Sequence, residues 1–496
     1  MSLLNKVAAL ALAGCLVAST AWPIDKFFPT FGNNGIDVLH YDLDLDVSVA
    51  PHNLDATAKL DVLALKDLNS FSLDIAELTV SKVTVAGVPA DFAQEDDKVK
   101  ITPWMRIAQG DVFKVDIAYS GTPKPIQDPT APNDPGMLLG WFKYKNAIYA
   151  LSEPVGASTF YPANDEPTDK ATFRIAITVP PLATAVSNGV LKSTTLVGEK
   201  KRFVWEMKQP MTSWLATVHV NRFDVNLSHT PRGTPLRFYT TRATSTEDLK
   251  GYALARKMLT YLEGLIGRYP FGGYGSVVVE DPALYYALET QAMSTFPLGA
   301  ADEAIVAHEL AHQWFGNSIS VAKWEDLWLA EGPATYFEVL WPNRNDPAAF
   351  DKAMNDMYDY VAQQKIGPAV VETPELIFSA RTYLRGSVAL HALRLTVGDR
   401  TFFKILKRFI ADYRGGNVTS RSFIATAVAV SGDGSVRGLL KAWLYEGPVP
   451  PLPGRAESVS AKRAPVAAPD VVGLRCGRGA HRGAPATCGD QASLPP

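Results

Sequence analysis

The spacing of apolar residues changes once along this chain, and the change constrains the fold more than any single motif does. From about residue 41 to residue 223, apolar and polar residues alternate, which is the pattern of half-buried antiparallel strands. After residue 245 the apolar residues recur every three or four positions, as in amphipathic helices. The sequence therefore predicts an α+β multidomain protein, in which an N-terminal antiparallel β-sandwich or saddle domain precedes a mainly helical domain. Examples of the two patterns are Tyr41-Asp42-Leu43-Asp44-Leu45-Asp46-Val47 and the series Leu254, Met258, Tyr261, Leu262 and Leu265.

A chain of 496 residues is too long for one ordinary core, and turn-forming segments indicate where it divides. We expect a signal peptide over residues 1–21, an all-β domain over 30–232, and a mainly helical domain with a small β element over 233–447. A disordered basic tail rich in Ala, Pro and Gly follows over 448–496. Helical spacing covers residues 301–315, 326–340, 348–364, 385–397, 401–413 and 435–445.

The first 21 residues have the features of an export signal. Lys6 precedes an apolar run from Val7 to Ala18, and small residues follow at Ser19-Thr20-Ala21, where a signal peptidase would cut. The run is too short to span a bilayer, so we expect a secreted protein with no transmembrane segment in the mature chain. Leu12-Ala13-Gly14-Cys15 also resembles a bacterial lipobox, which would make the protein a cell-surface lipoprotein instead.

Composition excludes several classes of function. Apolar residues make up 47% of the chain and charged residues 20%, with a net charge of −3, so a nucleic-acid-binding protein is not expected. The three cysteines are Cys15, Cys476 and Cys488, of which the last two could pair in an oxidising compartment. Because the two predicted domains contain no cysteine, a metal in them would need histidine and carboxylate ligands.

The helical pattern over residues 301–315 contains the metal-binding motif H-E-x-x-H. A spacing of four residues puts the imidazoles of His308 and His312 on one helix face, so they can chelate one zinc ion. Glu309 lies beside them, in position to act as general base on a zinc-bound water. Eighteen residues separate His312 from Glu331, which a second helix offers as third ligand, leaving the fourth position for water.

Several neighbours of this motif leave alternatives open. Asp326 either orients a ligand histidine or is simply an acid at a helix N-terminus. His391 is expected to be packed or at the surface, and His481 solvated, so a three-histidine site is not favoured. Pro333, two residues after Glu331, predicts either a kinked helix or a shifted ligand.

These motifs resemble those of the aminopeptidase N family of zinc metallopeptidases, the gluzincins that include leukotriene hydrolase, in a short secreted bacterial form. The resemblance runs over roughly residues 35 to 447 and includes the whole signature of H-E-x-x-H, eighteen residues and Glu. It implies that residues 233–447 form a thermolysin-like zinc catalytic domain.

The resemblance also implies how a substrate is held. Tyr286-Ala287-Leu288-Glu289-Thr290 resembles the G-A-M-E-N exopeptidase motif, in which the glutamate captures a free α-ammonium. Glu289 is therefore expected to anchor the substrate, with Ala287 and Leu288 in the wall of the site. Leu151-Ser152-Glu153 resembles a Gln-x-Glu motif and implies a second anchor at Glu153. Tyr383, in a segment similar to Tyr-x-x-Gly, would donate a hydrogen bond to the oxyanion.

The predicted function is a zinc-dependent aminopeptidase that hydrolyses the N-terminal peptide bond of peptides, with Glu309 and Tyr383 as catalytic residues. A secreted thermolysin-like endopeptidase would share the zinc ligands but would need no ammonium anchor. A catalytically silent binding scaffold of the same family would lack part of the chemistry, which is intact here. Epoxide hydrolysis, as in leukotriene hydrolase, has no positive signal in the sequence.

Overall fold

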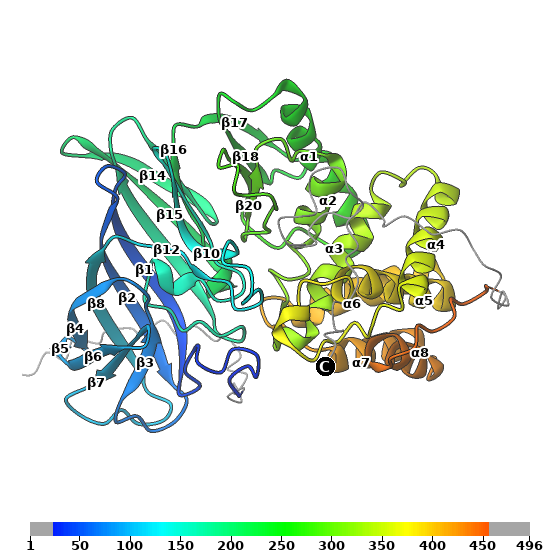
Figure 1. The fold of residues 1–496 in the computed structure, drawn as a ribbon, viewed down its shortest axis with the longest axis horizontal. Helices are drawn as coiled ribbons and strands as arrows, with labels where there is room; N and C mark the ends of the chain where they lie inside the picture. Colours follow the sequence, from blue (N-terminus) through cyan, green and yellow to red (C-terminus); the bar gives the residue numbers. More distant parts are fainter. Residues whose placement is uncertain (1–22, 456–496) are drawn as a thin grey trace, which may run out of the picture.

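The structure is a computed structural model and describes residues 23–455. A strand-rich N-terminal domain lies beside a mainly helical domain (Figure 1), which confirms the predicted α+β architecture. The predicted leader, Cys15, Cys476, Cys488 and His481 lie outside the described residues, as does the tail beyond residue 455.

An eight-stranded sheet forms the body of the N-terminal domain, and its alternation has a simple cause. Along its strand β1, Leu43 and Leu45 are buried, whereas Asp42 and Asp44 point outward. The outward acids pair with cations on nearby strands, as in the 2.6 Å contact between Arg202 and Asp44. Charged ladders of this kind let one face of the sheet meet water. The strands in spatial order are β14 (Val190–Val197), β15 (Lys200–Thr212), β12 (Lys170–Val179), β1 (Ile36–Ser48), β2 (Asn53–Ala64), β8 (Val112–Gly121), β4 (Thr79–Val85) and β5 (Val88–Pro89).

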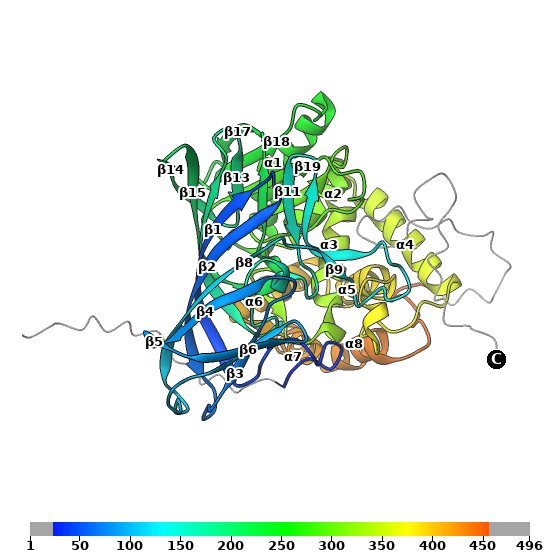
Figure 2. The ribbon, with the colours of Figure 1, turned by 60° about the vertical axis from the view of Figure 1, so that its left-hand side comes forward.

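This sheet is antiparallel except for one pair, because β1 and β12 run parallel. Two smaller sheets complete the domain. One has the order β13 (Thr184–Ser187), β16 (Val218–Asn221), β11 (Ala147–Leu151), β10 (Leu138–Tyr144) and β9 (Ile126–Gln127), and the other β3 (Phe71–Asp74), β7 (Lys98–Thr102) and β6 (Asp91–Glu95). The β10–β11 hairpin reaches the second domain (Figure 2), where the Tyr149 hydroxyl donates to Asp281 at 2.9 Å.

The second domain begins with a four-stranded mixed sheet. Its order is β17 (Asp224–His229), β18 (Pro235–Thr240), β19 (Tyr274–Val279) and β20 (Met293–Pro297). The expected domain boundary at residue 232 therefore falls within the β17–β18 hairpin. A short parallel pair, β21 (Ser320–Val321) and β22 (Asn417–Val418), lies deeper in the domain.

Eight α-helices form the rest of the described part of this domain, and seven of them match the predicted helical spacing. The exception is α7, whose N-terminal capping box pairs Thr419 with Ser422 rather than with the more familiar Glu or Gln. Helix α2 ends at Ala311, four residues before the predicted end, because the chain turns at Gly316 with φ +109°. The helices are α1 (Thr246–Ile266), α2 (Glu303–Ala311), α3 (Trp328–Leu340), α4 (Pro347–Gln363), α5 (Gly386–Val397), α6 (Asp399–Tyr413), α7 (Ser420–Ser431) and α8 (Ser435–Tyr445).

Helices α3 and α5 approach closely at a pair of glycines. A Cβ on Gly332 would lie 2.9 Å from the carbonyl carbon of Gly386, so only glycine fits this contact. Pro333 lies inside α3, which nevertheless continues as one helix to Leu340. Glu331 lies two residues before Pro333, in the first turn of this helix.

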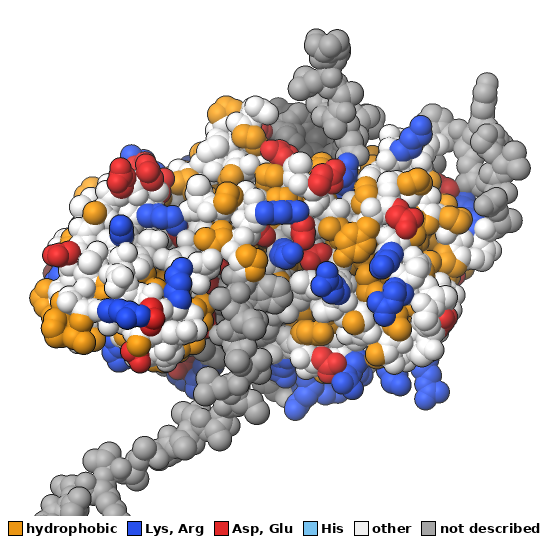
Figure 3. All heavy atoms as spheres, turned by 90° about the horizontal axis from the view of Figure 1, so that it is seen from below, with side chains coloured by type: hydrophobic (Ala, Val, Ile, Leu, Met, Phe, Trp, Pro, Cys, Tyr) orange, Lys and Arg blue, Asp and Glu red, His pale blue; other side chains and the backbone are white. Residues whose placement is uncertain are grey.

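Buried apolar residues from both domains form one continuous core, so the domains share a packed interface. None of the helices within residues 23–455 is long and apolar enough to cross a bilayer. On the face shown in Figure 3, basic, acidic and apolar side chains are interspersed, as the small net charge predicts.

Candidate active site

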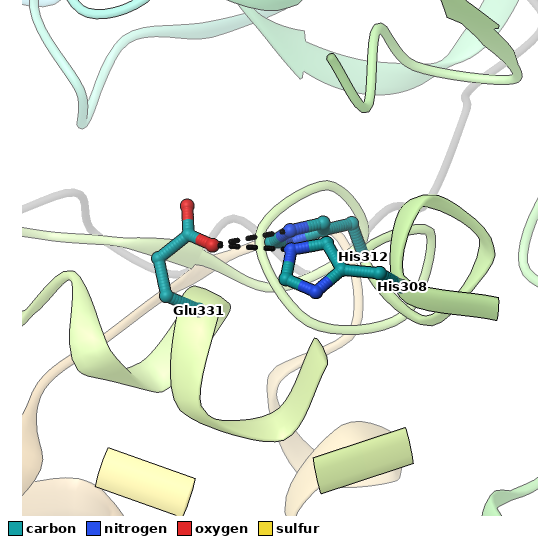
Figure 4. A group of neighbouring side chains, drawn as sticks. All are labelled: His308, His312 and Glu331. Carbon is teal, nitrogen blue, oxygen red and sulfur yellow. Dashed lines mark ion pairs between the residues drawn. The ribbon is translucent and has the colours of Figure 1, made fainter. Parts of the chain in front are cut away.

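Three buried side chains from adjacent helices converge on one point. His308 lies in the last turn of α2 and His312 directly after it, and Glu331 faces both from the first turn of α3 (Figure 4). The Nε2 atoms of the two histidines each lie 3.4 Å from Glu331 Oε2. The structure therefore assembles the predicted set of two histidines and one glutamate.

The spacing of these donor atoms fits a zinc ion. In a tetrahedral zinc site with bonds of about 2.0–2.1 Å, neighbouring ligand atoms lie about 3.3 Å apart. The two distances of 3.4 Å match that value, and one ligand atom from each side chain falls within 4.8 Å of the others. Three protein ligands leave a coordination position open, as in catalytic zinc sites.

Hydrogen bonds on the far side of each imidazole fix its orientation. His308 Nδ1 lies 2.9 Å from Glu338 Oε2, and His312 Nδ1 lies 3.1 Å from the carbonyl oxygen of Phe315. Both contacts place the proton on Nδ1 and leave Nε2 for the metal. Glu338 was not predicted, although it follows Glu331 by seven residues and so occupies the same face of α3. Asp326 instead accepts a hydrogen bond from the Ser420 hydroxyl.

Glu309 is buried beside the two histidines, with 2% of its surface exposed. Burial raises the pKa of Glu309 to about 8, and the neighbouring histidines oppose the shift. A cation held by His308, His312 and Glu331 would lower this pKa, because positive charge favours the carboxylate. The position and environment of Glu309 suit a group that accepts a proton and later returns it.

A second group of carboxylates adjoins the metal ligands. Oxygens of Glu153, Glu289 and Glu331 lie within 4.8 Å of one another, and all three side chains are buried. Glu153 follows β11 in the N-terminal domain, whereas Glu289 precedes β20 in the second domain. Burial raises the pKa of Glu289, while His312 opposes the shift. The arrangement creates a strongly negative site that favours a bound cation.

Two amide side chains hold Glu289 by its backbone. Its carbonyl oxygen accepts hydrogen bonds from Asn317 Nδ2 at 2.6 Å and from Gln313 Nε2 at 3.2 Å. Both donors belong to the segment that carries the H-E-x-x-H motif, so the anchor segment is tied directly to the metal-binding helix. Neither donor was predicted, because the contact joins residues that are more than twenty positions apart.

The residues before Glu289 lie against the N-terminal domain. Leu288 exchanges backbone hydrogen bonds of 2.8 Å with Thr295, and its side chain packs in a small apolar cluster that also contains Leu151. Ala287 is buried nearby, with 8% of its surface exposed. Leu151 stands where the resemblance has Gln, so an apolar contact across the domain interface occupies this position.

Tyr383 also reaches the metal ligands. Its ring stacks on His308, with centroids 6.1 Å apart and an angle of 14° between the planes. Tyr383 lies in the π-helical turn Arg381–Arg385, a local geometry that often occurs at functional sites and that apolar spacing does not predict. His391, by contrast, packs against Phe350 in the core, where burial lowers its pKa to about 4. It is therefore a packed histidine and not a ligand.

Comparison with known proteins shows which family the chain belongs to, and its members are zinc enzymes. Residues 38–215 match the Peptidase M1 N-terminal domain, and residues 258–443 match the Peptidase family M1 domain. The chain is also similar to an M1 zinc metallopeptidase from Deinococcus radiodurans, solved as a glutamate-to-alanine mutant with a Tyr-Ser-Ala substrate. The identity is 30%, the TM-score is 0.79, and the match covers 86% of this chain and 98% of the other. The chain belongs to peptidase family M1.

Curated M1 relatives are named aminopeptidases. Aminopeptidase M1 of Arabidopsis thaliana is 25% identical over 446 residues, which cover 81% of this chain and 49% of the relative. Human glutamyl aminopeptidase is 27% identical over 324 residues, which cover 58% of this chain and 34% of the relative. The chain thus spans about half the length, or less, of the curated M1 relatives that it matches. Membership of this zinc metallopeptidase family implies a zinc ion, and the two histidines and the glutamate described above have the donor atoms and spacing to hold it.

Proposed function

We propose that this M1 enzyme is an aminopeptidase that uses one zinc ion and removes the N-terminal residue from peptides with a free α-ammonium. The observation that carries the proposal is the convergence of Glu153 and Glu289 on Glu331, with carboxylate oxygens within 4.8 Å of one another. The first two side chains can hold a cationic group while the third holds the metal.

The distances limit which peptide bond can be cut. One residue of a peptide spans about 3.8 Å between consecutive Cα atoms. Carboxylate oxygens of Glu153 and Glu289 lie within 4.8 Å of an oxygen of Glu331, so an α-ammonium held by the first two side chains leaves room for about one residue before the scissile bond. The geometry therefore favours exopeptidase over endopeptidase action, because a longer N-terminal extension would meet the buried carboxylates.

Glu309 and Tyr383 would act together with the zinc ion in the hydrolysis itself. Zinc at this site would polarise the scissile carbonyl and bring the pKa of a bound water towards neutrality. Glu309 would accept the proton of that water and pass it to the leaving amine. Tyr383, stacked on His308, would donate a hydrogen bond to the oxyanion that forms at the carbonyl.

Selectivity for free N-termini tests the proposed specificity. We expect the enzyme to hydrolyse fluorogenic aminoacyl substrates and to leave the N-acetylated forms intact. Glu289→Ala should lower kcat/KM for the free substrates by about 30-fold or more, because truncating one partner of a buried charge pair costs about 2–5 kcal/mol. Glu247→Ala on the exposed start of α1 is the matched control and should behave as the parent does. Equal hydrolysis of free and acetylated substrates by the parent would support the endopeptidase alternative.

The role of Glu309 has a separate test. Glu309→Gln keeps the size of the side chain but removes the base, so we expect turnover to fall by a factor of about 10² to 10⁴. Zinc content, measured by atomic absorption, should stay at one ion per chain, because Glu309 is not a ligand. Full activity in a variant that retains zinc would contradict the role.

Secretion is a further part of the proposal. It rests on the charged, apolar and small-residue regions of residues 1–21. Mass spectrometry of the mature N-terminus in an export-competent host tests it: a terminus near Trp22 supports secretion, an acylated Cys15 supports the lipoprotein alternative, and an intact Met1 contradicts both.

A further inference from the structure

Lys170 is a lysine of the N-terminal domain whose ammonium group lies inside the catalytic domain. It begins β12, and its Nζ donates to the carbonyl oxygen of Asn317 and to the hydroxyl of Ser320, both at 2.9 Å. Two more carbonyl oxygens lie nearby, on Ser318 at 3.3 Å and on Gly416 at 3.5 Å. All four acceptors belong to the catalytic domain.

These acceptors are neutral, and within residues 23–455 Lys170 has no carboxylate partner. Burial accordingly lowers the pKa of Lys170 to about 7. An ammonium without a counter-ion is costly to remove from water. Each of the three carbonyl oxygens also accepts from a second donor of the catalytic domain: Asn317 from Ser320 Oγ at 3.2 Å, Ser318 from Gly415 N at 2.8 Å and Gly416 from Ser320 N at 3.1 Å. Lys170 therefore adds hydrogen bonds from the N-terminal domain to acceptors that already belong to the hydrogen-bonding network of the catalytic domain.

Three of the four acceptors belong to one turn, residues 316–320, which leads from helix α2 into strand β21, and the fourth, Gly416, directly precedes strand β22. Ser320 Oγ accepts from Lys170 and donates to the carbonyl oxygen of Gly316 at 2.6 Å. Lys170 thus holds the turn at two successive carbonyls, directly at Asn317 and through Ser320 at Gly316. Gly316 itself lies against the metal ligand His312, because a Cβ added there would be 3.3 Å from His312 Nδ1.

The same turn holds the segment of the ammonium anchor. Asn317 Nδ2 donates to the carbonyl oxygen of Glu289 at 2.6 Å, so a continuous path of hydrogen bonds runs from Lys170 through Asn317 to Glu289. Capture of an α-ammonium depends on the carboxylate position within roughly half an ångström. A shift of the turn would move Glu289 relative to Glu331 and to the metal.

We propose that Lys170 is a positioning residue for the ammonium anchor. It fixes the 316–320 turn from the N-terminal domain and so sets the distance between Glu289 and the metal ligands. The inference rests on the proposed aminopeptidase function. It predicts that loss of the Lys170 ammonium impairs capture of the substrate N-terminus more than the chemical step.

Lys170→Met in the full-length enzyme tests this, since methionine keeps most of the side-chain volume and removes every donor. We expect KM for a free aminoacyl substrate to rise about tenfold while kcat changes less than threefold. The inhibition constant of a free amino acid, which binds through its ammonium, should rise by a similar factor. The inhibition constant of acetohydroxamate, which binds the metal and has no ammonium, should not change.

Two further variants separate positioning from general destabilisation. Lys98→Met removes a partly buried lysine whose contacts, Asp74 and Gly32, lie in the N-terminal domain, so it should lower the unfolding temperature without changing KM. Ser320→Ala removes one acceptor of Lys170 and the link to Gly316, so it should raise KM by a smaller factor, and it serves if Lys170→Met does not fold.

The outcomes are distinct. Unchanged KM and amino-acid inhibition in Lys170→Met or Ser320→Ala, in an enzyme whose parent discriminates against acetylated substrates, would overturn the positioning role. Loss of zinc, or equal weakening of amino-acid and acetohydroxamate binding, would also overturn it by assigning the turn to the metal ligands. Failure of the parent to discriminate would instead overturn the proposed aminopeptidase function.

Discussion

Glu338 makes the contact that best tests how the protein prepares its metal site. Its Oε2 lies 2.9 Å from His308 Nδ1, and both side chains are 2% exposed. Removing the outer partner of a metal-bound histidine lowers metal affinity by about 10- to 100-fold. That range corresponds to about 1.4–2.8 kcal/mol. The loss of zinc affinity in Glu338→Ala should lie at the upper end of this range, because the substitution leaves a buried Nδ1–H without an acceptor. Glu338→Gln should fall at the lower end, because an amide oxygen can still accept.

The assay is zinc binding at equilibrium against a competing chelator, read by atomic absorption after the protein is separated. Asp326→Asn is the matched control: Asp326 is the acid that sequence spacing puts forward for this role, but it bonds to Ser420 in α7. We expect its zinc affinity to equal that of the parent. The reasoning would be refuted if Glu338→Ala bound zinc within twofold of the parent, or if Asp326→Asn showed the larger loss.

Two more perturbations concern buried groups, His219 and Gly332. Burial lowers the pKa of His219 to about 3, so the unfolded chain, with a histidine pKa of about 6.5, binds more protons between those values. The free energy of unfolding should therefore fall as the pH is lowered through that window. Denaturant unfolding at pH 5 and pH 7 measures this dependence, and in His219→Gln the free energy of unfolding should change less with pH, by up to about 1.4 kcal/mol per pH unit. Gly332→Ala, with its Cβ 2.9 Å from the Gly386 backbone, should lower stability by about 1–3 kcal/mol. Gly264→Ala in α1, where an added Cβ has no atom within 4 Å, should instead raise the free energy of unfolding by up to about 1 kcal/mol. If the same assay showed that both substitutions stabilise, or that both destabilise, the packing argument would be contradicted.

The periodic features of the chain were predictable because they depend on local chemistry. Alternating residues in β1 became a half-buried strand, and the Ser245 capping box begins α1 where the apolar spacing changes. Helix α7 was missed because its small and β-branched residues bury only a few large side chains, such as Phe423 and Ile424. The end of α2 was placed four residues late because the turn there is set by Gly316.

For the site, the H-E-x-x-H motif was enough to predict the candidate ligands His308 and His312, together with Glu309, the proposed general base between them. A helix brings residues four apart onto one face whatever surrounds it, so that part of the geometry follows from the chain alone. The spacing also offered Glu331 as a third ligand on the next helix. The family resemblance added Glu289, Glu153 and Tyr383, and the structure places each of them close to the three ligand side chains.

The contacts that hold these groups in place form only when the two domains are folded and packed together. Hydrogen bonds join segments that are remote in sequence: Glu338 to His308, Asn317 to Glu289, and Lys170 to the 316–320 turn. Such contacts produce no repeating pattern in the sequence, because a carboxylate, amide or ammonium group has no preferred distance along the chain to its partner. The candidate catalytic side chains can therefore be identified from the sequence, but their positions relative to one another depend on how the two domains pack.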